Sequence, residues 1–167
     1  MINNKFKYNL IITIHIVLFT ALKKDTHAQC NCESIIKENV LTVACPPSPI
    51  ATEHDTQIGL NVFKAYNQYQ LGVTIRFKYS PKEIYGNITM VLEDGNSIEL
   101  NYIDGGIVYL GNSQVAQAAF LISQNDLNKL KKSKLRIISF KLDDKMKRVY
   151  RITTSADLII RHIKCLS

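Results

Sequence analysis

From residue 57 onward, apolar and polar residues alternate, which is the pattern of a sheet with one buried and one solvent-exposed face. The clearest run is residues 71–79 (LGVTIRFKY), and residues 58–62 (IGLNV) share its period of two. The sequence YNQY at 66–69 lies between the two runs and predicts a turn. The pattern therefore predicts two neighbouring strands.

Residues 88–102 (ITMVLEDGNSIELNY) predict a second hairpin around an Asp-Gly turn. A two-residue loop would place apolar residues opposite polar ones and mix the two faces of the sheet. A three-residue loop, Asp94–Asn96, pairs Leu92 with Ile98 and keeps the apolar face intact. We therefore expect the three-residue loop.

Turn-forming residues divide the rest of the chain into short elements. Residues 33–44 fit either a short helix or a strand, and the prolines of 45–49 end any regular structure there. Residues 50–56 are expected to form a loop, and Asp104-Gly105-Gly106 to form a turn. The further strands that we expect are 107–110, 115–123, 135–142 and 147–153.

Two stretches have the spacing of a helix instead. Ser123 is expected to cap a helix over residues 124–132, and Ser155 to cap an amphipathic helix near 155–165. The sequence therefore predicts an α+β fold. It consists of a mainly antiparallel β-sheet of about six to eight strands, one short internal helix and a C-terminal amphipathic helix.

Several of these motifs follow one another in an order that resembles a known family. FLIS (120–123), LNKLK (127–131) and LRIISF (135–140) lie between the Asp94-Gly95 turn and the closing helix. This arrangement, over residues 85–166, is similar to small secreted or periplasmic proteins of Bacteroidetes-type bacteria. The resemblance implies an exported protein with this fold, and it implies no activity.

Residues 1–28 have the parts of a secretory signal peptide. Two lysines precede an apolar run at 10–22, and the small residues Thr26 and Ala28 occupy the positions before a cleavage site. The apolar run is shorter than the roughly 20 residues that span a bilayer. We predict cleavage after Ala28 and a secreted or periplasmic protein. The lysines directly after the apolar run leave an uncleaved membrane anchor as the alternative.

The chain thus divides into three segments: the signal peptide at 1–28, a cysteine-containing segment with a proline-rich linker at 29–56, and one sheet domain at 57–167. The leader carries four lysines and one aspartate, so its removal lowers the net charge from +7 to +4. A charge of +4 favours solubility without indicating nucleic-acid binding. We expect no nucleic-acid partner and no membrane span after cleavage.

Four cysteines follow the leader, and an even number in an oxidising compartment predicts two disulfides. Only one residue separates Cys30 from Cys32, so a bridge between them would be strained. Two pairings stay open: Cys30–Cys45 with Cys32–Cys165, or Cys32–Cys45 with Cys30–Cys165. Either pairing ties the start of the mature chain to its last residues.

The cysteines also have two alternative uses. Lipidation of Cys30 would leave an odd number of thiols, and Gln29 departs from the small residue that usually precedes a lipidated cysteine. A zinc site made of Cys30, Cys32, Cys45 and His54 would lack the spacing of a zinc knuckle. We therefore favour disulfides and expect no metal or other cofactor.

The sequence contains no GxSxG, HExxH, P-loop or Rossmann glycine pattern. Of the two histidines after the leader, His54 is expected in a solvated loop and His162 as a partly buried structural residue of the closing helix. The acidic pairs 93–94 and 143–144 are typical of tight turns rather than of paired glycosidase acids.

The densest positive charge lies in NKLKKSKLR at 128–136, which we expect to be mainly solvated surface and a candidate anion-binding surface. The sequence as a whole predicts an exported, non-catalytic module that binds a protein or a cell-envelope component. The alternative is a small extracytoplasmic hydrolase that uses His54 or His162 with nearby carboxylates. The basic residues of the candidate surface are Lys129, Lys131, Lys132, Lys134 and Arg136.

Overall fold

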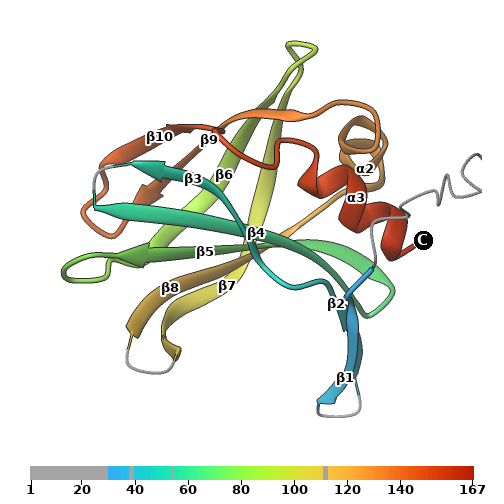
Figure 1. The fold of residues 1–167 in the computed structure, drawn as a ribbon, viewed down its shortest axis with the longest axis horizontal. Helices are drawn as coiled ribbons and strands as arrows, with labels where there is room; N and C mark the ends of the chain where they lie inside the picture. Colours follow the sequence, from blue (N-terminus) through green and yellow to red (C-terminus); the bar gives the residue numbers. More distant parts are fainter. Residues whose placement is uncertain (1–29, 38–39, 54, 111–112) are drawn as a thin grey trace, which may run out of the picture.

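The computed structural model describes residues 30–37, 40–53, 55–110 and 113–167. In this part of the chain, ten strands form an antiparallel sheet and two helices flank it (Figure 1). The strands are β1 (Glu33–Lys37), β2 (Val40–Ala44), β3 (Ser48–Glu53), β4 (Thr56–Ala65), β5 (Gln68–Phe77), β6 (Ile84–Leu92), β7 (Ser97–Leu110), β8 (Ser113–Leu121), β9 (Leu135–Leu142) and β10 (Lys147–Arg151), and the helices are α2 (Gln124–Leu130) and α3 (Leu158–Cys165).

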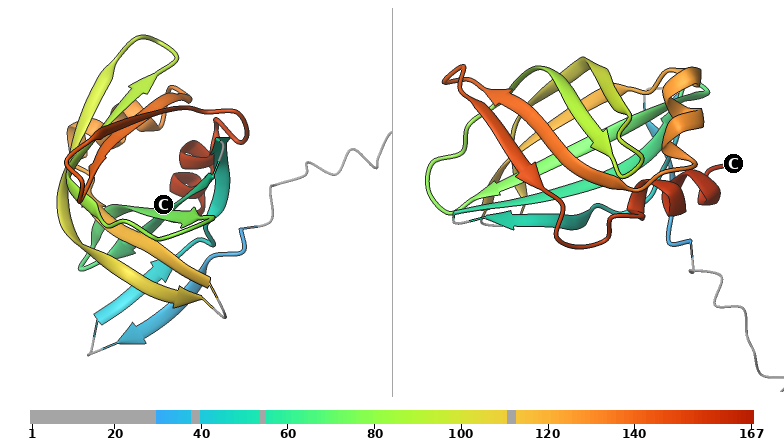
Figure 2. Two further views of the ribbon diagram at one scale, coloured as in Figure 1. Left: turned by 90° about the vertical axis from the view of Figure 1, so that its left-hand side faces the viewer. Right: turned by 90° about the horizontal axis from the view of Figure 1, so that it is seen from above.

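The sheet has the order β1-β2-β4-β5-β8-β7-β6-β9-β10, and β3 pairs with β4. It curls strongly, so that the chain leaving β10 meets β3 (Figure 2). There the backbone N–H groups of Thr153 and Thr154 donate to the carbonyl oxygen of Ile50, at 2.9 and 3.2 Å. Among the described residues, no helix is long and apolar enough to cross a membrane.

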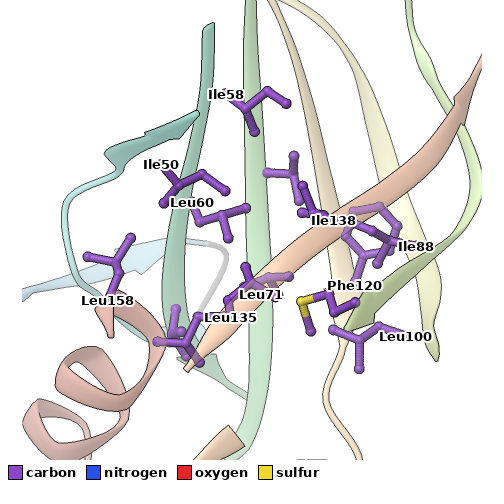
Figure 3. Packing of buried hydrophobic residues seen from close by; sticks show 14 of the residues in the cluster. Ile50, Ile58, Leu60, Leu71, Ile88, Leu100, Phe120, Leu135, Ile138 and Leu158 are labelled. Carbon is purple, nitrogen blue, oxygen red and sulfur yellow. The ribbon is translucent and has the colours of Figure 1, made fainter. Parts of the chain in front are cut away.

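The alternating apolar residues of the strands fill the inside of the curled sheet. Ile58 and Leu60 of β4, Leu71 of β5, Phe120 of β8 and Ile138 of β9 point into one shared core and are fully buried (Figure 3). Each buried side chain of this size contributes roughly 1.5–3 kcal/mol relative to an exposed one. The prediction of a mostly antiparallel sheet with one buried face is therefore confirmed.

The turn at 66–69 also agrees with the prediction. β4 and β5 pair continuously up to Ala65 opposite Gln68, so Tyr66 and Asn67 form the loop. Both loop residues have positive φ, 51° and 60°. A two-residue loop of this geometry matches the twist of the strands that it joins.

The second hairpin has a different register from the one predicted. Met90, rather than Leu92, lies opposite Ile98, so the three loop residues are Glu93, Asp94 and Gly95. Gly95 takes φ +87°, a conformation that glycine adopts without the steric penalty of a Cβ. The shift of two residues preserves the apolar face, which is why periodicity alone could not distinguish the two registers.

The predicted number of strands, six to eight, was wrong. β1 and β2 form a hairpin from the ambiguous residues 33–44, and β3 occupies part of the expected loop at 50–56. β3 pairs with β4 alone and shifts register between Pro49 and Ala51, so it tolerates a proline that a central strand would exclude. The expected turn at 104–106 is instead part of the long strand β7, which pairs with β8 through these three residues and has a bulge just before them, at Ile103.

Both helices are present, although one begins later than predicted. Ser123 caps α2 as expected, because its Oγ accepts from the backbone N–H of Asp126 at 3.2 Å. Ser155 does not cap α3, which begins at Leu158 after Asp157. Ser155 has φ 50°, and its carbonyl oxygen accepts from the Leu158 N–H, so it belongs to the turn that leads into the helix.

Candidate functional site

The hairpin of β1 and β2, called the arm below, projects from the rest of the molecule (Figure 2, left). Five consecutive residue pairs join its two strands, from Glu33 opposite Ala44 to Lys37 opposite Val40. β2 continues into the main sheet through its pairing with β4. β1 pairs with β2 only, within the part of the chain that the structure describes, so its outer edge ends the sheet.

Two disulfides hold the arm in place: Cys32–Cys45, with a Cα–Cα distance of 3.9 Å, and Cys30–Cys165, at 5.6 Å. The register of the arm decides this pairing. Because Glu33 lies opposite Ala44, the cysteine before β1 lies next to the cysteine after β2, and their bridge closes the base of the arm. Cys30 is then left to reach the last residue of α3.

The arm exposes apolar side chains on both of its faces. Ile35 is 52% exposed and Ile36 is 74% exposed, and neighbouring residues of a strand point to opposite faces. Leu41, directly opposite Ile36, is 57% exposed on the same face. Apolar residues that gather at the surface in this way mark interaction sites more often than singly scattered ones do.

Beside the arm lies a groove of about 540 Å³, between β2, the end of β4 and the C-terminal end of α3. It lies where the apolar inner face of the sheet reaches the surface, because Val43 and Leu166 contribute both to its lining and to the core region. The groove is lined by Val40, Leu41, Val43, Lys64, Tyr66, Asn67, Cys165, Leu166 and Ser167.

Lys64 carries the single charged side chain among the residues that line the groove. The alternation of β4 places it on the same face as the buried Val62, and it lies opposite Val43 of β2 and Tyr69 of β5. Its Nζ lies 5.3 Å from the centre of the Tyr69 ring, within the range of a cation–π interaction. The Tyr69 hydroxyl donates to the Leu166 carbonyl oxygen at 3.1 Å, which fixes the ring beside the groove.

His162 is buried in α3, in agreement with the structural role predicted from the sequence. Its Nδ1 accepts a hydrogen bond from the Val62 backbone N–H at 3.2 Å. Burial, with a smaller contribution from the positive charge of Arg161, lowers the pKa of His162 below its usual value. The imidazole is therefore neutral at pH 7, with its proton on Nε2. His54, the other histidine of the hydrolase hypothesis and of the zinc alternative, lies outside the described residues.

One acidic residue of each turn bonds to its own turn: Asp94 to Asn96, and Asp144 to the Met146 backbone N–H, which donates to its Oδ1 at 2.9 Å. Asp94 accepts from the backbone and side-chain N–H groups of Asn96, and these bonds lower the pKa of Asp94. Asp144 accepts from Lys82 at 2.6 Å and from Arg148 at 2.9 Å, and its pKa is lowered mainly by the Lys82 bond. In the residues that the structure covers, no group of three or more His, Cys, Asp or Glu side chains is placed to hold a metal ion.

The five basic residues of the candidate anion-binding surface lie along the end of α2, the following turn and the start of β9. Lys129 pairs with Asp126 within α2, at 3.5 Å, and is half-buried. The other four, Lys131, Lys132, Lys134 and Arg136, are exposed.

Comparison of the chain with protein-family models, curated proteins and solved structures finds no match. The function is therefore argued from the arm, the groove and their chemistry.

Proposed function

We propose that this chain is an exported, non-catalytic module that binds a partner polypeptide through the arm, by addition of a strand to the edge of β1. On this proposal the protein is of the same kind as the small secreted or periplasmic proteins that its motifs resemble. The observation that carries the proposal is the outer edge of β1. This edge ends the sheet in the described residues, and β1 carries two exposed isoleucines, Ile35 and Ile36, one on each face.

The edge of β1 lacks several of the features with which proteins protect an exposed edge, and its two charged residues, Glu33 and Lys37, stand at its ends. Its pairing with β2 contains no bulge, its sequence contains no proline, and its three central residues, Ser34, Ile35 and Ile36, are uncharged. Backbone N–H and C=O groups along such an edge bond to water until another extended polypeptide pairs with them. Exposed side chains on both faces then give the added strand an apolar contact above and below the sheet.

Two disulfides support the proposed compartment, because disulfides form and persist in oxidising environments. They also make the arm rigid. The bridge at the base of the arm fixes its strands in register before any partner binds, which lowers the conformational entropy lost on binding. The only histidine in the described residues, His162, accepts a backbone hydrogen bond inside the protein, which supports a non-catalytic role.

A displayed library of random peptides, selected on the oxidised protein, tests the proposal. We expect enriched apolar peptides that bind and that slow hydrogen exchange of β1 amides. Ile35→Lys, which places a charge on the edge strand, should weaken this binding at least tenfold. Val149→Lys is the matched control, because Val149 is a strand residue of similar exposure, 56%, outside the arm.

The proposal is wrong if no peptide is enriched, or if the enriched peptides bind both variants equally. It is also wrong if binding protects amides of other strands and leaves those of β1 unchanged.

A further inference from the structure

We propose that the groove beside the arm binds a medium-chain fatty acid, with its acyl chain against Leu41, Val43 and Leu166 and its carboxylate at Lys64. This site is separate from the edge of β1. It lies on the face of the arm that carries Leu41, whereas Ile35 lies on the opposite face. The inference therefore does not depend on the proposed function.

The lining of the groove suits an apolar chain. Leu41 is more than half exposed, and Val43 and Leu166 extend the apolar inner face of the sheet to the surface. A ligand that covers these residues removes apolar surface from water, which is the main driving force for such binding. The groove volume of about 540 Å³ is in the range of small-molecule sites.

The charge of the groove indicates which end group the ligand carries. At the position where β4 would continue its buried face after Val62, the chain has Lys64 instead of an apolar residue. None of the ion pairs found among the described residues includes Lys64. Its ammonium group lies above the Tyr69 ring, and the bond from Tyr69 to Leu166 holds that ring in place. One positioned cation beside aliphatic side chains complements one carboxylate on an apolar chain.

The topology favours an acyl chain over a peptide in the groove. β2 pairs with β1 over all five of its residues and with β4 over Thr42–Ala44, so the backbone on both sides of Val43 is already paired. A peptide that lay across Leu41 and Val43 would leave its own amides without partners against aliphatic side chains, which is unfavourable. An acyl chain has no such groups.

Titration calorimetry with dodecanoate, and with 1-dodecanol as the uncharged ligand of equal length, tests the inference on the oxidised protein. We expect saturable binding of one dodecanoate per chain, and at least tenfold weaker binding of dodecanol. Lys64→Gln should weaken the binding of dodecanoate at least tenfold, so that dodecanoate and dodecanol bind with equal affinity. The matched control is Lys78→Gln, because Lys78 also lies 5.3 Å from a tyrosine ring centre but lines no part of the groove.

A second variant keeps the test independent of the charge. Leu41 is exposed, so Leu41→Asn should leave the fold intact. It should lower the affinity for dodecanoate and for dodecanol by the same factor. Ile35→Lys should leave dodecanoate binding unchanged, which separates this site from the proposed strand-addition site.

Three results would overturn the inference: no saturable binding of dodecanoate, equal binding of dodecanoate and dodecanol by the unmodified protein, or an equal loss in the Lys64 and Lys78 variants. Binding to phosphatidylglycerol vesicles without binding of free dodecanoate would also overturn it, because the ligand would then be a membrane surface.

Discussion

The two disulfides enclose very different lengths of chain, and their contributions to stability should differ accordingly. Cys30–Cys165 joins residues 135 positions apart, whereas Cys32–Cys45 joins residues 13 positions apart. In the chain-entropy model, a bridge stabilises by restricting the unfolded chain, and its effect grows with the logarithm of the loop length. The model gives about 5 kcal/mol for the long loop and about 3 kcal/mol for the short one at 25 °C. We therefore expect a difference of about 2 kcal/mol between them.

Two double variants separate the bridges. Cys32→Ala/Cys45→Ala keeps only the long loop, and Cys30→Ala/Cys165→Ala keeps only the short one. The free energy of unfolding is measured by urea titration for each variant, once oxidised and once reduced. Each variant is compared with itself, because Cys45 is buried in the core and its replacement alone would alter packing.

The free energy of unfolding should be higher in the oxidised form than in the reduced form, by about 5 kcal/mol in the first variant and about 3 kcal/mol in the second. Both energies are upper values, so the test depends on which bridge stabilises more and on the difference between the two bridges. If the short loop stabilises as much as the long one, the reasoning from loop entropy is wrong for this protein. Peptide mapping that finds Cys30 joined to Cys45 would refute the pairing itself.

Further predictions concern the buried histidine and the hairpin turn. His162→Leu should lower the free energy of unfolding by about 1–3 kcal/mol in urea titrations, because it leaves the Val62 N–H without an acceptor, and His162→Gln should cost less. The unfolded chain takes up a proton near pH 6.5 while burial keeps the pKa of folded His162 lower, so stability should fall as the pH drops below 6.5. The Gln variant should lack this slope between pH 7.5 and 5.5, and an unchanged slope would contradict the assignment. Gly95→Ala should lower the free energy of unfolding by about 1–2 kcal/mol in the same titrations, because Gly95 has φ +87°. Gly106→Ala is the control and should not destabilise the protein, because no atom lies near the added Cβ. Equal losses in the two variants would refute the turn assignment.

The parts of the fold that could be predicted are those with a regular period and a local signal. Ile58 to Val62 of β4 and Leu71 to Phe77 of β5 alternate regularly, and two residues with positive φ lie between the strands. α2 begins at a serine that can bond to its first turn, with buried leucines at positions 127 and 130. In such segments the local preference and the tertiary structure agree, so the sequence is sufficient.

The errors come from segments in which the tertiary structure overrides the local signal. β3 contains a proline, which is acceptable because β3 pairs with one strand, β4, and shifts register next to that proline. β7 runs through Asp104 and its two glycines because β8 pairs with it on either side of a bulge. Ser155 has a side chain that could cap a helix, but it lies in the turn between β10 and α3 with φ 50°, and α3 begins only after Asp157. No local pattern contains this information, since it depends on residues far along the chain.

The candidate site lies between these two cases. The groove itself could not be predicted, because it forms only when the end of α3 packs beside β4 and the arm, which lie far earlier in the chain. The sequence reasoning missed Lys64, although the pattern contains a signal for it: after Ile58, Leu60 and Val62, the next residue on the buried face is a lysine. A charge at that position is unfavourable for a core and therefore needs a reason, either a ring to lie on or an anion to bind. Tyr69 supplies the ring, and the exposed leucine beside it would leave room for the apolar chain of the proposed ligand, so the break in the alternation is the local signal that could have singled out this residue.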